Sequence, residues 1–261
     1  MFECKLDGMF LRRLFESLKE ICSDVSIDCS DEGLTMQAMD NSHISLIHLK
    51  LAPDFFHLYR CDLPCTLGIN ISFMLKILSV VKEKSLIYLS RGDMSEDPVL
   101  NIRIIEDVGA NLTLESDSLE AQVKLIEVDR EHLEIPSCDY SCKCVMNSKK
   151  FQEFAKYLHS IGETVTISMS ENEMRLETEG EGIRASKRFH SDVGEVRVTS
   201  IENLSQIFAT RYLVLFSKAT NLAEQVSINL SAGIPLSVKF GFSDEEDTSF
   251  INFYLAPNIE E

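Results

Sequence analysis

The sequence predicts an α+β protein made of two similar domains, each with two helices packed on antiparallel sheets. The first observation is a repeat, because residues 10–36 match residues 150–176 at a constant offset of 140 without a gap. The second is that, in both copies, the apolar positions change from helical to strand spacing at the same point. The third is the length of 261 residues, which suits two domains of ordinary size. We expect domains over 1–119 and 137–261, joined by a connecting loop over 120–136.

The matched residues of the repeat are apolar in both copies. The pairs at helical spacing are Leu11 with Phe151, Leu14 with Phe154, Leu18 with Leu158 and Ile21 with Ile161. The pairs at strand spacing are Val25 with Val165, Ile27 with Ile167, Cys29 with Met169, Leu34 with Met174 and Met36 with Leu176. Any helix followed by a hairpin could give a partial match. Here the apolar positions of the two copies stay aligned from the helix into the hairpin, which favours an internal duplication of the sequence.

The first half shows two amphipathic helices among strand-like runs. Strands are expected over 2–6, 45–51, 86–89, 100–105 and 111–114, besides the hairpin of the repeat. The helix over 9–19 is predicted to bury Phe10, Leu11, Leu14, Phe15 and Leu18. The helix over 72–82 is predicted to bury Phe73, Met74, Ile77, Leu78 and Val81.

The second half repeats this order after an acidic segment over 120–136. Loops longer than about 12 residues are uncommon in compact domains unless they function, so this segment is a candidate functional loop. A helix is expected over 148–159 with Ser148 as its N-cap, and another after Asn203, with Gln206 completing a capping box, to Lys218. Strands are expected over 140–146, 226–230, 236–242 and 249–255.

The charge is distributed unevenly. The chain has a net charge of −17, which taken whole argues against binding nucleic acid. Each of the four expected helices nevertheless carries +2, so the helices together hold +8 and the remainder −25. Exposed helix faces often carry mixed charge, but four positive faces in so acidic a chain indicate a local surface for a polyanion.

Other functional classes receive little support. No phosphate loop, dinucleotide fingerprint, zinc-protease or nucleophile-elbow motif is present, and His43 and His48 are spaced to face opposite sides of a strand. The cysteine spacings around Cys61, Cys65, Cys138 and Cys142 do not match a structural zinc site, so we expect reduced buried thiols, no metal and no cofactor. The longest uncharged run, 225–238, contains Gly233 and Pro235 and is too short to span a membrane. We expect a soluble intracellular protein that is not an enzyme.

Several motifs spread over the whole chain resemble one family. They are MFE at 1–3, MDNSHISL at 39–46, YRCD at 59–62, LEIP at 133–136, YSC at 140–142, LHSIG at 158–162 and YLAP at 254–257. The chain resembles the proliferating cell nuclear antigen family, the eukaryotic sliding clamps. This resemblance implies the DNA-clamp fold and a nuclear homotrimeric ring around duplex DNA, with helices lining the hole.

The resemblance also implies partners and sites. The ring would act as a processivity factor for DNA polymerase and would recruit the clamp loader and other replication and repair proteins. The implied DNA-facing residues are Arg12, Arg13, Lys19, Lys76, Lys82, Lys149, Lys150, Lys156, Arg211 and Lys218. The implied groove for partner peptides uses Met39, His43, Leu133, Ile135, Pro136, Pro235, Tyr254, Ala256 and Pro257. The implied subunit joint uses Ala121, Val123, Leu125, Ile183 and Ala185.

The family's partners carry a motif with a Gln, an aliphatic residue three positions on and two adjacent aromatic residues. This chain departs from the family at Glu134, where Gly is frequent, and at Ser79, where Lys is common. Glu171 stands where many members carry the lysine that receives ubiquitin, and the segment 91–118 is longer than usual. Two alternatives stay open, a subunit of the heterotrimeric checkpoint clamp and a metal-dependent nucleic-acid enzyme. A homotrimer in solution would exclude the first, and turnover abolished by a chelator would support the second.

Overall fold

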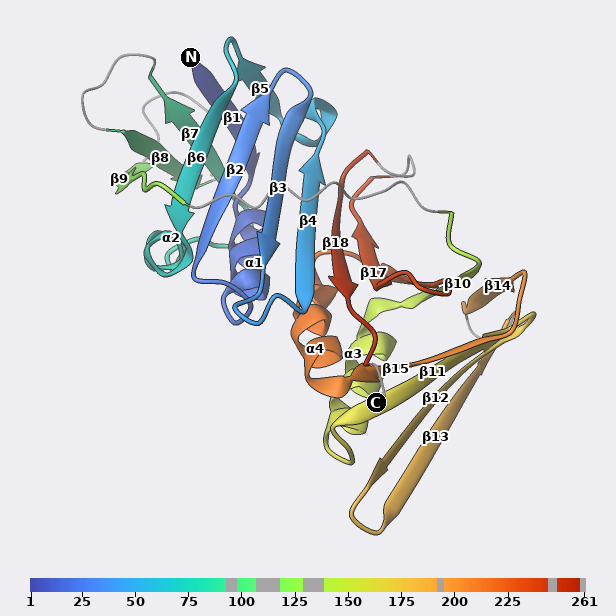
Figure 1. Cartoon of the computed structure of the whole chain (residues 1–261). Coiled ribbons are helices and arrows are strands. Elements are labelled where there is room, and N and C mark those ends of the chain that lie inside the picture. The colour runs from blue at the N-terminus through green and yellow to red at the C-terminus, as the bar shows by residue number, and fades with distance from the viewer. Residues whose placement is uncertain (93–97, 107–117, 129–138, 192–194, 244–247, 259–261) are drawn as a thin grey trace. The chain divides into compact units, whose positions relative to one another are not determined.

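The computed structural model describes residues 1–92, 98–106, 118–128, 139–191, 195–243 and 248–258 (Figure 1). The chain forms two compact units. The first unit comprises Met1–Asn41, His48–Leu133 and Phe242–Phe250, and the second comprises Ser42–Ile47, Glu134–Gly241 and Ile251–Glu261. Within the described ranges, no helix is both long and apolar enough to cross a membrane.

The first unit has two helices and antiparallel strands. Its helices are α1 (Gly8–Leu18) and α2 (Ile71–Leu78), which pack against each other. One sheet has the order β5 (Leu58–Cys61), β1 (Phe2–Asp7), β7 (Ser85–Arg91), β8 (Val99–Glu106) and β9 (Ser118–Lys124). A second run of neighbours is β6 (Cys65–Asn70), β2 (Asp24–Ser30), β3 (Gly33–Met39) and β4 (Ser45–Leu51). A short 3-10 helix, η1 (Pro53–Phe55), precedes β5.

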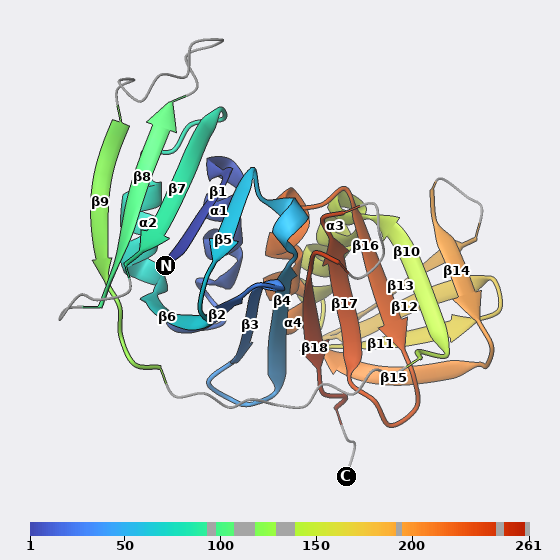
Figure 2. The same cartoon turned by 90° about the horizontal axis from the view of Figure 1, so that it is seen from above.

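The second unit has the same kind of architecture (Figure 2). Its helices α3 (Ser148–His159) and α4 (Thr210–Phe216) pack together, and the 3-10 helix η2 (Ser217–Asn221) continues α4. One run of neighbours is β14 (Arg197–Ser200), β10 (Cys142–Asn147), β16 (Gln225–Leu230), β17 (Leu236–Gly241) and β18 (Phe250–Leu255). The other is β13 (Ile183–His190), β12 (Glu173–Gly180), β11 (Thr164–Ser170) and β15 (Leu204–Ala209). The predicted α+β class, with two helices on antiparallel sheets in each half, is therefore confirmed.

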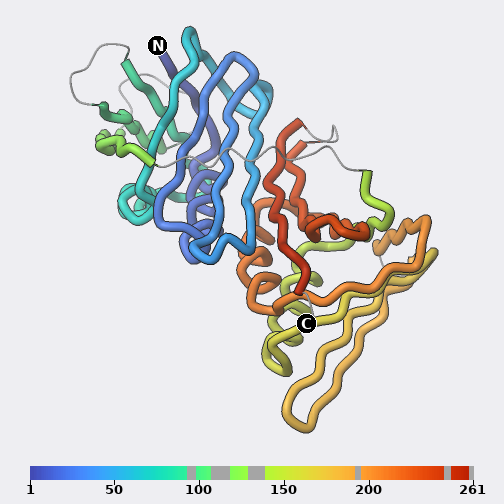
Figure 3. Tube along the Cα trace, viewed as in Figure 1, coloured from blue at the N-terminus to red at the C-terminus, as the bar shows by residue number. Residues whose placement is uncertain are grey.

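The repeat predicted from the sequence has the same structure in both units (Figure 3). Strand β2 begins and ends 140 residues before β11, and β3 begins 140 residues before β12. The matched Val25 and Val165, and likewise Ile27 and Ile167, are buried. Most of the apolar positions shared by the two copies thus face the core of the same helix-and-hairpin element, whereas Phe154 and Ile161 are half-buried.

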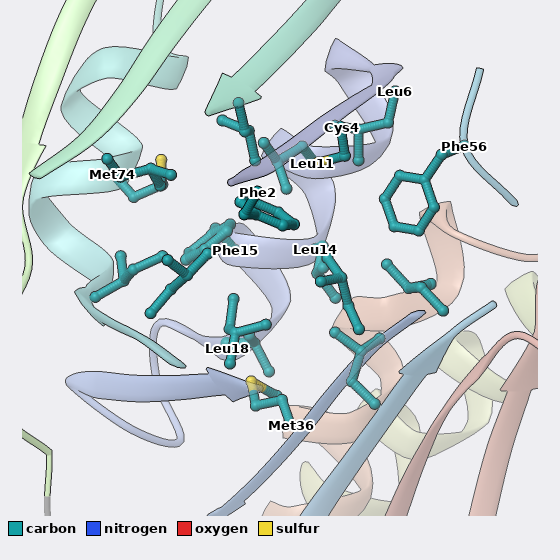
Figure 4. A pocket seen from close by; sticks show the side chains of 18 residues that line it. Phe2, Cys4, Leu6, Leu11, Leu14, Phe15, Leu18, Met36, Phe56 and Met74 are labelled. Atoms are coloured by element: carbon teal, nitrogen blue, oxygen red, sulfur yellow. The ribbon is translucent and has the colours of Figure 1, made fainter. Parts of the chain in front are cut away.

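The core of the first unit is formed by α1 against its sheets. The helix buries Leu11, Leu14, Phe15 and Leu18, which meet Phe2 and Leu6 of β1 (Figure 4). A small cavity of about 30 Å³ remains among these apolar side chains. Because a buried water needs polar partners, a cavity of this size with an apolar lining is a packing void.

Helices α1, α2 and α3 begin at aspartate or asparagine caps, whereas α4 follows Ala209, whose side chain makes no cap hydrogen bond. The carboxylate of Asp7 accepts a hydrogen bond from the amide of Phe10 at 2.6 Å, and Asn70 accepts one from the amide of Phe73 at 3.1 Å. For α3 the cap is Asn147, whose side chain accepts from the amides of Lys149 and Lys150. The predicted N-cap Ser148 is wrong by one residue, because Ser148 already belongs to the helix and is buried.

The predicted start of the fourth helix is also wrong. Residues Leu204–Ala209 form β15, which pairs with β11 so that Phe208 lies opposite Val165. The helix α4 begins only at Thr210. The capping-box pattern of Asn203 and Gln206 is therefore not used, since pairing with a neighbouring strand overrides the local helix signal.

The second helix is shorter than predicted and buries fewer residues. It ends at Leu78, and Phe73, predicted to be buried, is 55% exposed. The ammonium nitrogen of Lys76 lies 5.4 Å from the centre of the Phe73 ring. The helix thus presents an aromatic ring, together with a cation, on its outer face.

The connecting segment begins as a strand. Residues 120–124 of the predicted loop belong to β9, which pairs with β8. The rest of the loop from residue 129, and the strand expected over 111–114, lie outside the described residues. The predicted domain boundaries therefore stay a prediction.

Candidate nucleic-acid interface, partner groove and subunit joint

Four of the five basic residues proposed for DNA in the first unit are exposed. Arg13 lies on α1, Lys19 follows its end, Lys76 lies on α2 and Lys82 follows α2. Because α1 and α2 pack against each other, these cations belong to one helix pair. The pair offers positive charge to a polyanion through long, mobile side chains.

Arg12 is different, because its guanidinium is used within the unit. Its Nε donates to Glu16 Oε1 at 2.9 Å, one helical turn further along α1. Its Nη1 donates to the carbonyl oxygens of Ser79 and Val81, both at 3.4 Å. Ser79 directly follows α2 and Val81 lies two residues further on, so Arg12 ties α1 to the end of α2.

Lys82 makes an ion pair at the surface. Its Nζ lies 2.7 Å from Glu106 Oε1, and the two side chains are 70% and 55% exposed. Exposed pairs of this kind contribute only about 0–1 kcal/mol, because water and salt screen them. A phosphate can therefore compete for Lys82 at little cost.

The second unit carries its basic residues on α3, α4 and η2. Lys149, Lys156 and Arg211 are exposed, whereas Lys150 and Lys218 are half-buried. The Arg211 guanidinium carbon lies 4.7 Å from the centre of the Tyr212 ring, and its Nη2 donates to the Tyr212 hydroxyl at 3.1 Å. Tyr212 thus holds the Arg211 cation in place on α4.

Most groove residues that the structure describes lie in the second unit, where the start of β17 is next to the end of β18. Pro235 directly precedes β17, and Tyr254 lies near the end of the neighbouring strand β18. The hydroxyl of Ser237 on β17 donates to Asn252 of β18 at 2.9 Å, which sets these strand ends side by side. Pro235 is exposed and Tyr254 is half-buried.

The segment around His43 joins the same strand end. The amide of Ala256, just after β18, donates to the carbonyl of Ile44 at 3.1 Å. His43 has a positive φ of 55°, which non-glycine residues adopt infrequently, and its side chain is exposed. His43, Pro235, Tyr254, Ala256 and Pro257 are thus on elements that meet. Met39 is half-buried in the first unit, and Leu133, Ile135 and Pro136 lie outside the described residues.

The residues predicted for the subunit joint lie on two strands that end their sheets. Strand β9, followed by Leu125, ends the sheet of the first unit, and β13 ends one sheet of the second unit. Ala121 and Ala185 are half-buried, and Ile183 is 57% exposed. A terminal strand leaves backbone amides and carbonyls on its outer edge ready to pair with another strand.

The side chains of Val123 and Leu125 do not face outward. They are 3% and 6% exposed, and Val123 lies opposite Leu100 of β8. A charge introduced at either position would therefore enter the core of the unit and destabilise its fold. These two residues could reach a partner only through their backbone.

Two exposed aromatic residues were not predicted from the sequence to belong to any site. Phe73 lies on α2, which also contacts β9, and Tyr157 on α3 is 54% exposed. The repeat offered a signal for Tyr157, because the offset of 140 aligns it with the buried Ser17. A large aromatic side chain cannot occupy the place of a buried serine, so the two copies must differ there.

The chain is similar to known proteins over nearly its full length. The model of the proliferating cell nuclear antigen N-terminal domain matches residues 1–132, and that of the C-terminal domain matches residues 134–258. The chain belongs to the proliferating cell nuclear antigen (PCNA) family. It is 51% identical to proliferating cell nuclear antigen 2 of Plasmodium falciparum (isolate 3D7), over 99% of each chain. It is 32% identical to the proliferating cell nuclear antigen of Chaetomium thermophilum, over 99% of this chain and 98% of the relative.

Membership of the PCNA family accounts for the two-domain architecture. The two matching PCNA domains correspond to the two halves that share the helix-and-hairpin repeat. PCNA-family proteins are sliding clamps of DNA replication and repair, and they act as scaffolds and not as enzymes. Within the described ranges, no group of three or more His, Cys, Asp or Glu side chains is placed to hold a metal ion.

Proposed function

We propose that this chain closes as a homotrimeric ring around duplex DNA in the nucleus, without catalytic activity of its own. The ring serves as a processivity factor for DNA polymerase and recruits replication and repair proteins through the groove at Tyr254. The observation that carries the proposal is the pair of terminal strands β9 and β13, one in each unit. A closed ring pairs every such edge with an edge of the next subunit.

The surroundings of both strands support this joint. Leu119 on β9 and Ile183 on β13 are exposed apolar residues on the edge strands themselves. Phe73 is exposed on α2, a helix that contacts β9. In the second unit, Phe154 of α3 packs against Phe189 of β13 with ring centres 5.1 Å apart, and the same helix carries the exposed Tyr157. Pairing β9 with β13 of another copy would cover these apolar side chains.

The basic helices support DNA binding without base recognition. Their exposed cations are lysines and arginines suited to phosphate contacts, which position a protein on DNA but carry no sequence information. The strongly negative remainder of the chain repels DNA elsewhere. Retention on DNA therefore depends on ring closure, and direct affinity is weak and sensitive to salt.

The test combines assembly and topology. Light scattering of the full chain is expected to give about three times the chain mass of 29.5 kDa. After loading, the protein should stay on circular duplex DNA and leave after the circle is linearised. A monomer at micromolar concentration, or equal retention on circular and linear DNA, would overturn the proposal. Assembly only with two different clamp subunits would assign the chain to the checkpoint clamp instead.

A further inference from the structure

Four strands of the first unit bring cysteines together. Cys4 lies on β1, Cys29 on β2, Cys61 at the end of β5 and Cys65 at the start of β6. In the β2–β6 pairing Cys29 lies directly opposite Cys65. The thiols of Cys29 and Cys61 both lie close enough to Cys65 to change its pKa. All four are free thiols.

A cation and partial exposure distinguish Cys65 from the other thiols. Arg91, at the end of β7, is anchored beside Cys65, because its Nη1 donates to the carbonyl of the next residue, Thr66, at 2.8 Å. Its positive charge acts on the Cys65 thiol. Cys65 and Cys61 are half-buried, whereas Cys29 is 1% exposed. A small reagent from solvent therefore meets Cys65 before it meets Cys29.

The surroundings give the opposed thiols of Cys65 and Cys29 different pKa values. The adjacent thiol of Cys29 and the charge of Arg91 lower the pKa of Cys65 to about 6, against the opposing effect of burial. The adjacent Cys65 and burial raise the pKa of Cys29. The proton is thus held on Cys29 and the negative charge on Cys65. Burial raises the pKa of Cys144 to about 12, and burial with the nearby Asp24 raises that of Cys22 to about 12.

We propose that Cys65 is an oxidation site, at which a peroxide converts the opposed thiols of Cys65 and Cys29 into a reversible disulfide. In the first step the Cys65 sulfur attacks one peroxide oxygen, the O–O bond breaks, and the departing hydroxide takes a proton from solvent as water. Cys65 is then a sulfenic acid. In the second step Cys29 loses its proton and attacks the Cys65 sulfur, the S–O bond breaks, and the second oxygen leaves as water. Two thiols and hydrogen peroxide thus yield one disulfide and two waters.

The strand register favours Cys29 as the partner. Directly opposed residues of antiparallel strands have Cα atoms about 4.5–5.5 Å apart, which lies within the range of about 4.4–6.8 Å for disulfides. Cys61 lies on β5, which belongs to the sheet of β1 and is not a neighbour of β6. Bonding to Cys29 requires little backbone movement because the two strands already pair from Asp24 to Cys29.

Thiol reactivity of the native full chain gives the first test. Iodoacetamide labelling, resolved by peptide mass spectrometry, should reach its half-maximal rate at Cys65 near pH 6, whereas an ordinary thiol does so near pH 8.5. Cys22 and Cys144 serve as internal controls and should stay unlabelled at neutral pH. A Cys65 midpoint at the ordinary thiol value would overturn the proposal.

Peroxide treatment gives the second test. Non-reducing peptide mapping should find a Cys29–Cys65 link that dithiothreitol removes, and the matched Cys61→Ser control should still form it. Cys65→Ser should abolish the link, and Cys29→Ser should leave a sulfenic acid at Cys65 that dimedone traps. A Cys61–Cys65 link in the native protein would overturn the pairing, and no link at all would overturn the proposal.

Discussion

The guanidinium Nη1 of Arg12 lies 3.4 Å from the carbonyl oxygen of Ser79, the residue that directly follows α2. The last carbonyls of a helix have no partners within the helix and carry the negative end of its dipole. A cation from α1 at this place satisfies one of them and neutralises part of the dipole. Arg12 therefore stabilises the helix pair whose other cations face outward.

This relationship predicts that Arg12→Ala lowers stability. Losing the contacts to Ser79 and Val81 should cost about 1 kcal/mol, since Arg12 is only partly exposed. The melting temperature should fall by about 2–4 °C in thermal unfolding. The control Lys19→Ala removes the same charge from an exposed position after α1 and should change it little. Equal melting temperatures would show that Arg12 is a surface cation like the others.

Removing exposed cations from the second helix pair should weaken DNA binding without changing assembly. The triple variant Lys149→Ala, Lys156→Ala and Arg211→Ala should lower the slope of log K against log salt by about 0.9 for each lost phosphate contact. The molar mass should stay that of the wild type. A control with Lys5, Lys143 and Arg197 changed to Ala removes the same charge from strands β1, β10 and β14. Equal slopes for both variants would place the DNA surface elsewhere.

Charges at the two edge strands should have different effects. Ile183→Glu places a carboxylate on the exposed side of β13, so it should give folded monomers in light scattering. Val123→Glu buries a charge and should cost about 3 kcal/mol or more of folding stability. Ile201→Glu, at a position that is 84% exposed, is the matched control and should remain trimeric. A trimeric Ile183→Glu variant would argue against a joint at β13.

Tyr254→Ala should weaken a peptide with the family's partner motif. Truncating a central aromatic anchor costs about 2 kcal/mol, which corresponds to roughly 30-fold in affinity. Calorimetric titration measures this change. The same substitution at Tyr157, which lies on α3, should leave peptide affinity unchanged. Wild-type affinity for Tyr254→Ala would remove this residue from the groove.

The sequence determined the repeated element and the charge of the helices. Period and apolarity are local properties, so the match at an offset of 140 predicted α1 with β2 and β3, and α3 with β11 and β12, close to their observed bounds. Local polarity likewise predicted that Lys76 and Lys149 lie on exposed helix faces. The family motifs were readable because they are contiguous in the chain.

Only the tertiary structure decided which partners meet across long sequence distances. Strand pairing with β11 made residues 204–209 a strand despite a helix signal, and pairing with β8 turned Val123 inward. Arg12 reaches Ser79, and Cys29 faces Cys65, because packing and register bring them together. No periodicity along the chain encodes these distances, since each depends on how two separate segments align. The sequence therefore determined the elements and their polarity. The fold decided which side chains are buried or paired within the chain and which stay accessible to partners.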